Sequence, residues 1–320
     1  MSSSTRASST TEPGTDPLRR LPSAEIPAQA GLPSAQQPGR GWFTLLLRRR
    51  EAVAGGVIML LMLAVALAAP WLATYEPTRL DPIERLRAPG EAHWFGTDDF
   101  GRDVYSQVIY GARTSLLVGG MVMVCSSLLG ILLGLAAGYY RTLDNLLMRI
   151  TDGLMAFPGI VLAIALMASL GPQVANVIIA LSAVYMPRMA RLIRSAVLVA
   201  RELLYVEAAR ASGAADRRIA LQHILPNCIP PLIVQGTFIF AYAVLAEATL
   251  SFLGVGAPPY IPSWGNVISG GRLFIREAPW ITLFPGIAIV VTCLGLNLFG
   301  DGLRDALDPR LRDVDAAPRS

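Results

Sequence analysis

The stretch SLLVGGMVMVCSSLLGILLGLAAGY, residues 115–139, decides the fold of this chain. It contains no charged residue, and a helix of about 20 apolar residues crosses the roughly 30 Å hydrocarbon core of a bilayer. The stretch is therefore predicted to be a membrane-spanning helix. Gly130, Gly134 and Gly138 recur every four residues, so they share one helix face and allow another helix to approach closely. We expect helix packing on this face, with the lining of a solute path as the alternative for Gly130 and Gly134.

Five further apolar runs are interpreted as membrane spans. They cover residues 52–72, 154–170, 174–186, 231–253 and 281–299. Only Gly171-Pro172-Gln173 separates the second of these runs from the third, so the two are expected to form a tight antiparallel hairpin. The run 174–186 is short for a full span and is expected to continue as helix through Pro187, because the arginines beyond it can reach the headgroup level. The sequence thus predicts an all-α, polytopic membrane protein with six transmembrane helices.

The composition agrees with a membrane protein, because 53% of the 320 residues are hydrophobic, 16% are charged and the mean hydropathy is +0.49. Residues 1–40 are rich in Ser, Thr, Pro, Gly and Ala and contain no apolar run, so they are expected to form a disordered cytoplasmic tail rather than a signal peptide. The membrane domain is assigned to residues 41–312, and a short C-terminal tail to residues 313–320.

All 27 basic residues are arginine. Without lysine the chain has no phosphate-binding loop of the G-x-x-x-x-G-K-[ST] type and no lysine nucleophile, which excludes ATP hydrolysis by such a loop and Schiff-base chemistry. His93 and His223 lie far apart in the sequence, and the three cysteines have no C-x-x-C spacing. No metal site is therefore expected, and the cysteines are interpreted as small packing residues.

The arginines also predict the orientation of the chain. When the six spans are threaded through a bilayer, seven arginines fall on one side: Arg79, Arg85, Arg87, Arg102, Arg113, Arg272 and Arg276. The other 20 of the 27 fall on the side that holds both termini. Because arginine accumulates on the cytoplasmic side of membrane proteins, both termini are expected in the cytoplasm.

The largest feature expected on the cytoplasmic side is the segment 188–229. Apolar residues recur at steps of three and four over residues 188–204, with arginines between them, which indicates an amphipathic helix. Gly213 then separates two helical stretches, and Pro226 is expected to end the second. Such a compact projection suits docking on another protein. The alternative is that its arginines only fix the orientation and contact anionic lipid.

Within this segment, Glu207-Ala208-Ala209, Gly213 and Leu225-Pro226 resemble the EAA motif of ATP-binding-cassette importer permeases. His223 departs from the general motif, which has isoleucine there, and is similar to the peptide-transporter branch. Further similarity to the C-type permease subunits of dipeptide and oligopeptide (peptide/nickel) importers extends over about residues 42–312. It lies in the stretches 95–103, 110–116, 247–254, 262–265 and 300–310.

The resemblance implies the type I importer transmembrane fold and the role of a permease subunit that has no catalytic residue and binds no cofactor. The implied partners are two ATP-binding-cassette ATPase subunits, a second homologous permease, an extracytoplasmic substrate-binding protein and the lipid bilayer of the inner membrane, with no nucleic acid. The implied substrate is a peptide or a related small solute, such as glutathione or a nickel complex.

The resemblance further implies that the segment 188–229 contains a coupling helix, which fits a groove of an ATPase subunit. The residues implied to couple are Glu207, Ala208, Ala209, Arg210, Gly213, Arg217, Arg218, Leu225 and Pro226. Glu207 is expected to brace the turn through hydrogen bonds. Gly213 is expected to permit the backbone reversal.

On the outer side, the loop 73–113 carries a signature of the same family. Its members are Gly96, Asp98, Gly101, Arg102 and Asp103. We expect a turn stabilised by Asp–Arg pairing, which either packs on the outer ends of the helices or faces the substrate-binding protein. In the second outer loop, Trp264 and Trp280 are expected to anchor the chain at the membrane interface.

Glu247 is an acidic residue deep in an apolar run, and it is expected to line the path or to pair at a subunit interface. A transporter driven by an ion gradient is a competing interpretation, but it would be expected to show several intramembrane carboxylates. An intramembrane enzyme is another, but it would need a buried Ser–His pair or an H-E-x-x-H helix, and neither histidine lies in a predicted span. Both are weaker than the importer permease.

Overall fold

The computed structural model describes residues 46–47 and 49–307. The predicted tails, 1–40 and 313–320, lie outside the described residues, as do both ends of the predicted membrane domain, 41–45 and 308–312. Within the described ranges the regular elements are helices, joined by turns and loops. Their order is α2 (Arg50–Leu67), α3 (Ala69–Leu72), η2 (Pro82–Glu84), α4 (Val104–Tyr139), α5 (Arg141–Met155), α6 (Gly159–Leu170), α7 (Val174–Ala200), α8 (Leu204–Ala211), α9 (Asp216–Arg218), η3 (Ile219–Ile224), α10 (Leu225–Phe252), α11 (Trp264–Gly271), η4 (Arg272–Phe274) and α12 (Trp280–Leu307).

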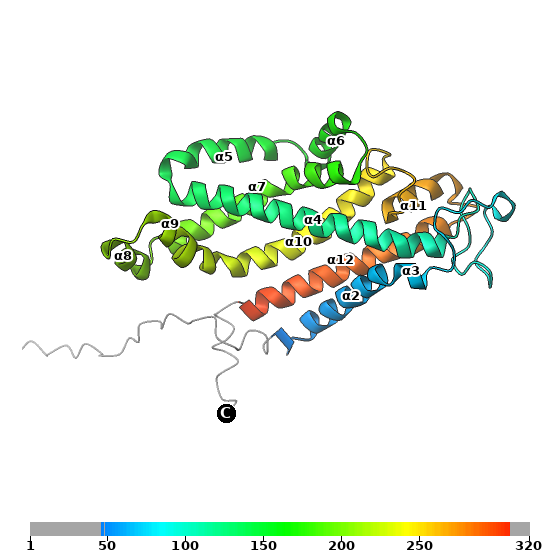
Figure 1. Ribbon diagram of the computed structural model, residues 1–320, viewed down its shortest axis with the longest axis horizontal. Coiled ribbons are helices and arrows are strands. Elements are labelled where there is room, and N and C mark those ends of the chain that lie inside the picture. Colours follow the sequence, from blue (N-terminus) through cyan, green and yellow to red (C-terminus); the bar gives the residue numbers. More distant parts are fainter. Residues whose placement is uncertain (1–45, 48, 308–320) are drawn as a thin grey trace, which may run out of the picture. The chain divides into compact units, whose positions relative to one another are not determined.

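The predicted all-α membrane fold is confirmed. Four single helices, α2, α4, α7 and α12, are long and apolar enough to cross a bilayer, and so is the continuous helical run 216–252. These long helices lie side by side, with α8 near one end of them and the 73–103 loop near the other (Figure 1). The helices α5 and α6 together make a sixth span only if they are counted as one broken helix, because they are bent by 91°.

The predicted span 154–170 is therefore not one continuous helix. Helix α5 ends at Met155, and α6 begins only at Gly159. Pro158 explains the break, because proline donates no backbone hydrogen bond and disfavours helical geometry at the residue before it, Phe157. Helix α6 has 12 residues and a length of about 18 Å, which is short of the roughly 30 Å that a full span needs.

Helix α4 is longer than the apolar run that predicts it, because it begins at Val104 rather than near Ser115. Its 36 residues correspond to about 54 Å, so the helix extends beyond the hydrocarbon core. Helix α7 continues through Pro187 to Ala200 without a break, as the sequence predicts. The turn between α6 and α7 is closed by Asn176, whose side-chain amide donates to the carbonyl oxygens of Leu170 and Gly171.

The glycine face of α4 packs against α7, as predicted. A Cβ atom at Gly130 would lie 2.5 Å from the Cβ of Met189, and one at Gly134 would lie 2.5 Å from the carbonyl oxygen of Ala190. At Gly138 the obstacle is the Cβ of Val197, at 2.7 Å. These glycines therefore serve the contact between two helices of one chain. The apolar core beside this contact also includes side chains from α6 and α10.

We predict that Gly134→Leu destabilises the α4–α7 contact by about 1–3 kcal/mol, because the added side chain would force the two backbones apart. The midpoint of thermal unfolding of the purified chain in detergent measures this. Gly120→Ala is the matched control on the same helix, since the nearest atom to its Cβ, in Phe240, is 3.8 Å away. Equal midpoints for the two variants would contradict the prediction.

Candidate functional site

The segment after α7, residues 204–224, folds as a compact projection around Gly213. Helix α8 ends at Ala211, and Gly213 has a left-handed backbone with φ of +77°. The amide of Gly213 donates to the carbonyl oxygen of Arg210 at 3.0 Å, and that of Ala214 donates to Ala209 at 3.1 Å. These two bonds form a Schellman motif, which ends a helix with a sharp change of direction. The predicted helix–turn–helix is thereby confirmed.

The prediction that Pro226 ends the second stretch is wrong. Residues 216–252 form one helical run, in which the π-helical turn η3 stands directly before α10. Pro226 lies in the first turn of α10, where its missing N–H costs least because the first amides of an α-helix have no partner within it. The preceding π turn shifts the hydrogen-bond register, and the proline is accommodated without ending the helix.

Hydrogen bonds fix this projection to the membrane helices. The hydroxyl of Tyr139, the last residue of α4, donates to Asp216 Oδ1 at 2.6 Å. The hydroxyl of Tyr205 donates to the carbonyl oxygen of His223 at 3.3 Å and accepts from Asn227 Nδ2 at 2.8 Å. The projection is therefore bonded to α4 through Asp216 and to α10 through Tyr205. The sequence analysis did not single out either tyrosine, since a partner in another helix leaves no local pattern.

Most of the predicted coupling residues lie on the surface of this projection, and only Ala209 and Leu225 are half-buried. The carboxylate of Glu207 is exposed and accepts no hydrogen bond within the described residues, so the predicted brace is wrong. Its charge faces outward instead. Leu204, with 76% of its surface exposed, is an apolar residue on the same helix, α8, that the sequence analysis missed.

Two ion pairs join α5 to α7 near the projection. Asp144 binds Arg194 through both oxygens, at 2.5 and 2.7 Å, and Asp152 Oδ1 lies 2.6 Å from Nη2 of Arg191. Arg201 donates through Nη1 to the carbonyl oxygen of Gly138 at 3.1 Å. The alternative that the arginines of this segment only fix the orientation and contact lipid does not hold for these three, because they bind within the chain.

At the opposite end of α4, the outer signature forms a tight turn around Asp98. The carboxylate, which is 2% exposed, accepts from the backbone amides of Phe100 and Arg102, from Arg102 Nε at 2.7 Å and from Gln107 Nε2 at 2.9 Å. The predicted Asp–Arg pairing is confirmed. Gly101 has a φ of +71°, and a Cβ there would lie 1.8 Å from the carbonyl oxygen of Asp81, so only glycine fits.

The second buried carboxylate of the turn, Asp103, caps the start of α4. It accepts from the backbone amide of Ser106 at 2.8 Å and from the Ser106 hydroxyl at 2.7 Å. Its other oxygen lies 2.8 Å from His93 Nδ1. Gly96 is also left-handed, and a Cβ there would lie 2.7 Å from Nε1 of Trp280, which donates to the carbonyl oxygen of Thr97. The signature therefore ties the outer loop to the ends of α4 and α12.

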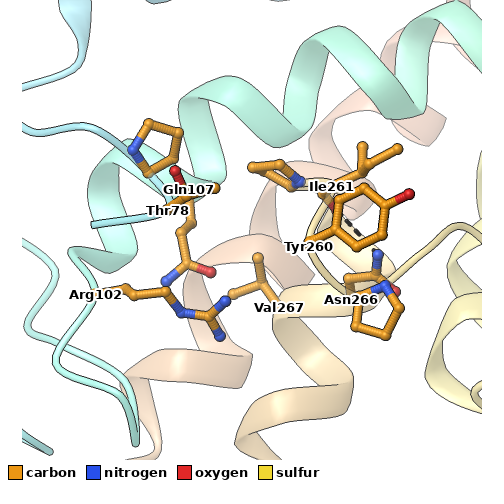
Figure 2. Close-up of a pocket in the computed structure, with 10 residues that line it drawn as sticks. Thr78, Arg102, Gln107, Tyr260, Ile261, Asn266 and Val267 are labelled. Carbon is orange, nitrogen blue, oxygen red and sulfur yellow. Dashed lines mark hydrogen bonds between the residues drawn. The ribbon is translucent and has the colours of Figure 1, made fainter. Parts of the chain in front are cut away.

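The two outer loops meet beside this turn. Figure 2 shows Arg102 and Gln107 on one side of a small cavity and Tyr260 and Asn266 on the other. The Asn266 side-chain amide donates to the carbonyl oxygens of Ala257, Pro258 and Ile261, which closes the second loop. The cavity holds about 10 Å³, room for one water molecule at most, so it is a joint between loops rather than a solute pocket.

Glu247 and Trp264 lie close together inside the chain. The Glu247 carboxylate is fully buried, and it accepts from the hydroxyls of Ser115 at 3.1 Å and Ser251 at 2.9 Å. In this conformation it lines no surface that a solute or another subunit can reach. Trp264 is 1% exposed and donates through Nε1 to the carbonyl oxygen of Val108, so its predicted place at the membrane interface is wrong.

The long apolar helices, with a folded projection at one end and a tied outer turn at the other, define a multi-pass integral membrane protein. Residues 127–313 match the family described as binding-protein-dependent transport system inner membrane component. Residues 38–89 match the N-terminal transmembrane domain of oligopeptide transport permease C. The chain therefore belongs to the inner-membrane permeases of binding-protein-dependent ABC importers, in the peptide-transport branch, and is a permease subunit rather than an enzyme.

Curated relatives cover nearly the whole chain. A putative peptide transport system permease of Brucella suis is 53% identical over 267 residues, which are 83% of this chain and 90% of that protein. The dipeptide transport system permease of Alkalihalophilus pseudofirmus is 45% identical over 280 residues, 87% of this chain and 92% of that one. The glutathione transport system permease of Pectobacterium atrosepticum is 42% identical over 281 residues, with 87% and 93% covered.

A chain of the MetNI methionine ABC transporter, solved in inward-facing conformations, has the same fold. The TM-score is 0.53 at 18% sequence identity, and the match covers 63% of this chain and 97% of that one. At this identity the likeness extends to the fold alone.

We predict that Asp98→Ala opens the outer turn, because it leaves the buried donors of Arg102 and Gln107 without an acceptor, at a cost of about 3 kcal/mol. Trypsin should then cleave the purified chain within the 73–103 loop about a hundredfold faster.

Asp99→Asn is the matched control at the next position. Burial and the charge of Asp98 raise the pKa of the Asp99 carboxyl, and its Oδ1 is buried without a hydrogen-bond partner. An acid whose pKa is raised in the folded state stabilises the fold in its protonated form. This contribution to the free energy of unfolding is lost as the pH rises past the ordinary pKa of the acid. Ionised Asp99 therefore opposes folding at neutral pH. Asp99→Asn should therefore leave cleavage unchanged or slow it. Equal acceleration in both variants would contradict the role of Asp98.

Proposed function

We propose that this chain is one of two homologous permease subunits that form the path of an ATP-driven importer for peptides or related small solutes. The peptide and dipeptide permeases among its relatives support this substrate class, and the glutathione permease widens it to peptide-like solutes. An extracytoplasmic binding protein would deliver the solute, and two ATPase subunits would supply the energy. The chain contains no lysine, which fits a division of labour in which the phosphate loop belongs to a partner.

The observation that carries the proposal is the projection formed by α8, Gly213 and residues 216–224. Its surface combines the exposed Leu204 with charged side chains at Glu207, Arg217 and Arg218, a mixture suited to a groove on another protein. We assign the docking of an ATPase subunit to this surface.

The connections of the projection explain how force would reach the membrane. Helix α7 ends at Ala200 and is joined to the projection by the short turn 201–203, whereas the helical run 216–252 leaves the projection without a break. Tyr139 adds a third connection, to α4. Closure of the ATPase subunits would therefore move α10 and α4 directly with the projection, and α7 through the turn 201–203. The path would then open alternately to the two sides of the membrane.

Gly213 tests this coupling. We predict that Gly213→Val costs about 1–2 kcal/mol at a left-handed position, distorts the projection and lowers the solute imported per ATP hydrolysed. No atom lies within 4 Å of a Cβ at this position, so only the backbone conformation opposes a side chain. Gly213→Asn is the matched control, because asparagine tolerates this conformation. Uptake and ATP hydrolysis by the complete transporter in proteoliposomes measure the ratio, and equal coupling in both variants would contradict the proposal.

We also propose that both termini are cytoplasmic, because most arginines lie on their side of the spans. Two exposed positions report the orientation: Ile83, 93% exposed in the outer loop, and Thr142, at the opposite ends of the helices. In a chain with its native cysteines replaced, a membrane-impermeant maleimide should label Ile83→Cys in spheroplasts. It should label Thr142→Cys only after permeabilisation. The reverse pattern would contradict the orientation.

A further inference from the structure

A large apolar groove lies between α2 and α4. Its volume is about 790 Å³, within the range of ligand pockets. Side chains from the two helices form its walls, and Phe240 of α10 and Phe299 of α12 complete its lining. The wall residues Leu60, Leu67 and Leu117 are each more than half exposed, so nothing in the described part of the chain covers them.

The groove has one charged lining residue, Arg113, at the end near the outer loop. The side chain is exposed, and within the described residues it forms neither an ion pair nor a hydrogen bond. It differs in this from Arg102, Arg191 and Arg194, which are all paired with carboxylates. A free guanidinium at the mouth of an apolar groove is complementary to an anion that carries an apolar chain.

The dimensions of the groove match one leaflet of a bilayer. Its lining on α4 extends from Arg113 to Val124, which is about 16 Å of helix and close to half of a hydrocarbon core of roughly 30 Å. Trp71 lies one turn beyond Leu67, the last groove residue on α2, and is 84% exposed. Because exposed tryptophans gather at the headgroup level, the mouth of the groove is at the depth of a lipid phosphate.

We propose that this groove binds one anionic phospholipid, with its phosphate on the guanidinium of Arg113 and an acyl chain along the wall between α2 and α4. Gly56 and Gly120 leave the space for the chain: the atoms nearest to a Cβ at these positions, in Phe299 and Phe240, are 3.6 and 3.8 Å away. A larger side chain at either glycine would project into the groove without striking the backbone. The site is independent of ATP coupling and of the solute.

The test uses the full-length chain in mild detergent, titrated with dioleoyl phosphatidylglycerol or with dioleoyl phosphatidylcholine, while native mass spectrometry counts the bound lipid. The wild type should bind phosphatidylglycerol more tightly than phosphatidylcholine. Arg113→Gln should weaken phosphatidylglycerol binding about fivefold, equivalent to about 1 kcal/mol for one arginine near an anionic surface. It should leave phosphatidylcholine binding nearly unchanged. Arg276→Gln, which removes an exposed outer arginine that does not line the groove, is the matched control and should have no effect.

Filling the groove separates the acyl-chain contact from the headgroup contact. Gly120→Leu should weaken the binding of both lipids, and Gly56→Leu provides the same test from the other helix if the first variant does not fold. Three results would overturn the proposal. The first is equal phosphatidylglycerol binding by Arg113→Gln and Arg276→Gln. The second is that inorganic phosphate competes for the site as strongly as the lipid does. The third is a Gly120→Leu chain that keeps its lipid but no longer co-purifies with a second permease. The last result would make the groove a subunit interface.

Discussion

The close approach of α4 and α7 is the contact on which the other parts of the structure depend. In a bilayer, lipid tails are as apolar as leucine, so helices gain little from burying apolar surface and associate mainly through tight packing. Gly130, Gly134 and Gly138 permit that packing by removing side chains along one face of α4, and each would clash with α7 if it carried a Cβ. The register between the two helices is thereby fixed over about two turns.

This fixed register determines where both functional ends lie. Helix α4 is continuous from the outer turn, where Asp103 caps it, to Tyr139, which bonds to the projection. Helix α7 leads to the projection through the short turn 201–203. The pairs of Asp144 with Arg194 and of Asp152 with Arg191 join α5 to α7. In the proposed coupling, a displacement at the projection would be transmitted by helices of fixed length, and the 91° break between α5 and α6 would be a point where the membrane part bends.

The sequence predicted those features that are recorded in local patterns. Apolar length predicted the long helices, the four-residue glycine spacing predicted the α4–α7 face, and glycine with flanking helical stretches predicted the turn at Gly213. It failed where a neighbour distant in the sequence, or a rare local backbone geometry, decides the outcome. Trp264 is typical of an interfacial anchor until the carbonyl oxygen of Val108 accepts its N–H inside the chain. The continuation of the helix through Pro226 depends on a π turn, for which no residue pattern is diagnostic.

The arginines illustrate why charge counting alone misjudges a membrane protein. Their number on each side predicts an orientation. A guanidinium that has a carboxylate nearby, however, forms an ion pair within the chain, as in the bidentate pair of Arg194 with Asp144. Such a bidentate pair joins two helices. A fully exposed ion pair in water would contribute little to the stability of the fold. Arg113 lies at the mouth of the groove without such a carboxylate. An unpaired cation beside an apolar groove is stabilised by an anion of the surrounding membrane. Arginine therefore joins α5 to α7 at one end of the helices and, as Arg113, contacts lipid at the other.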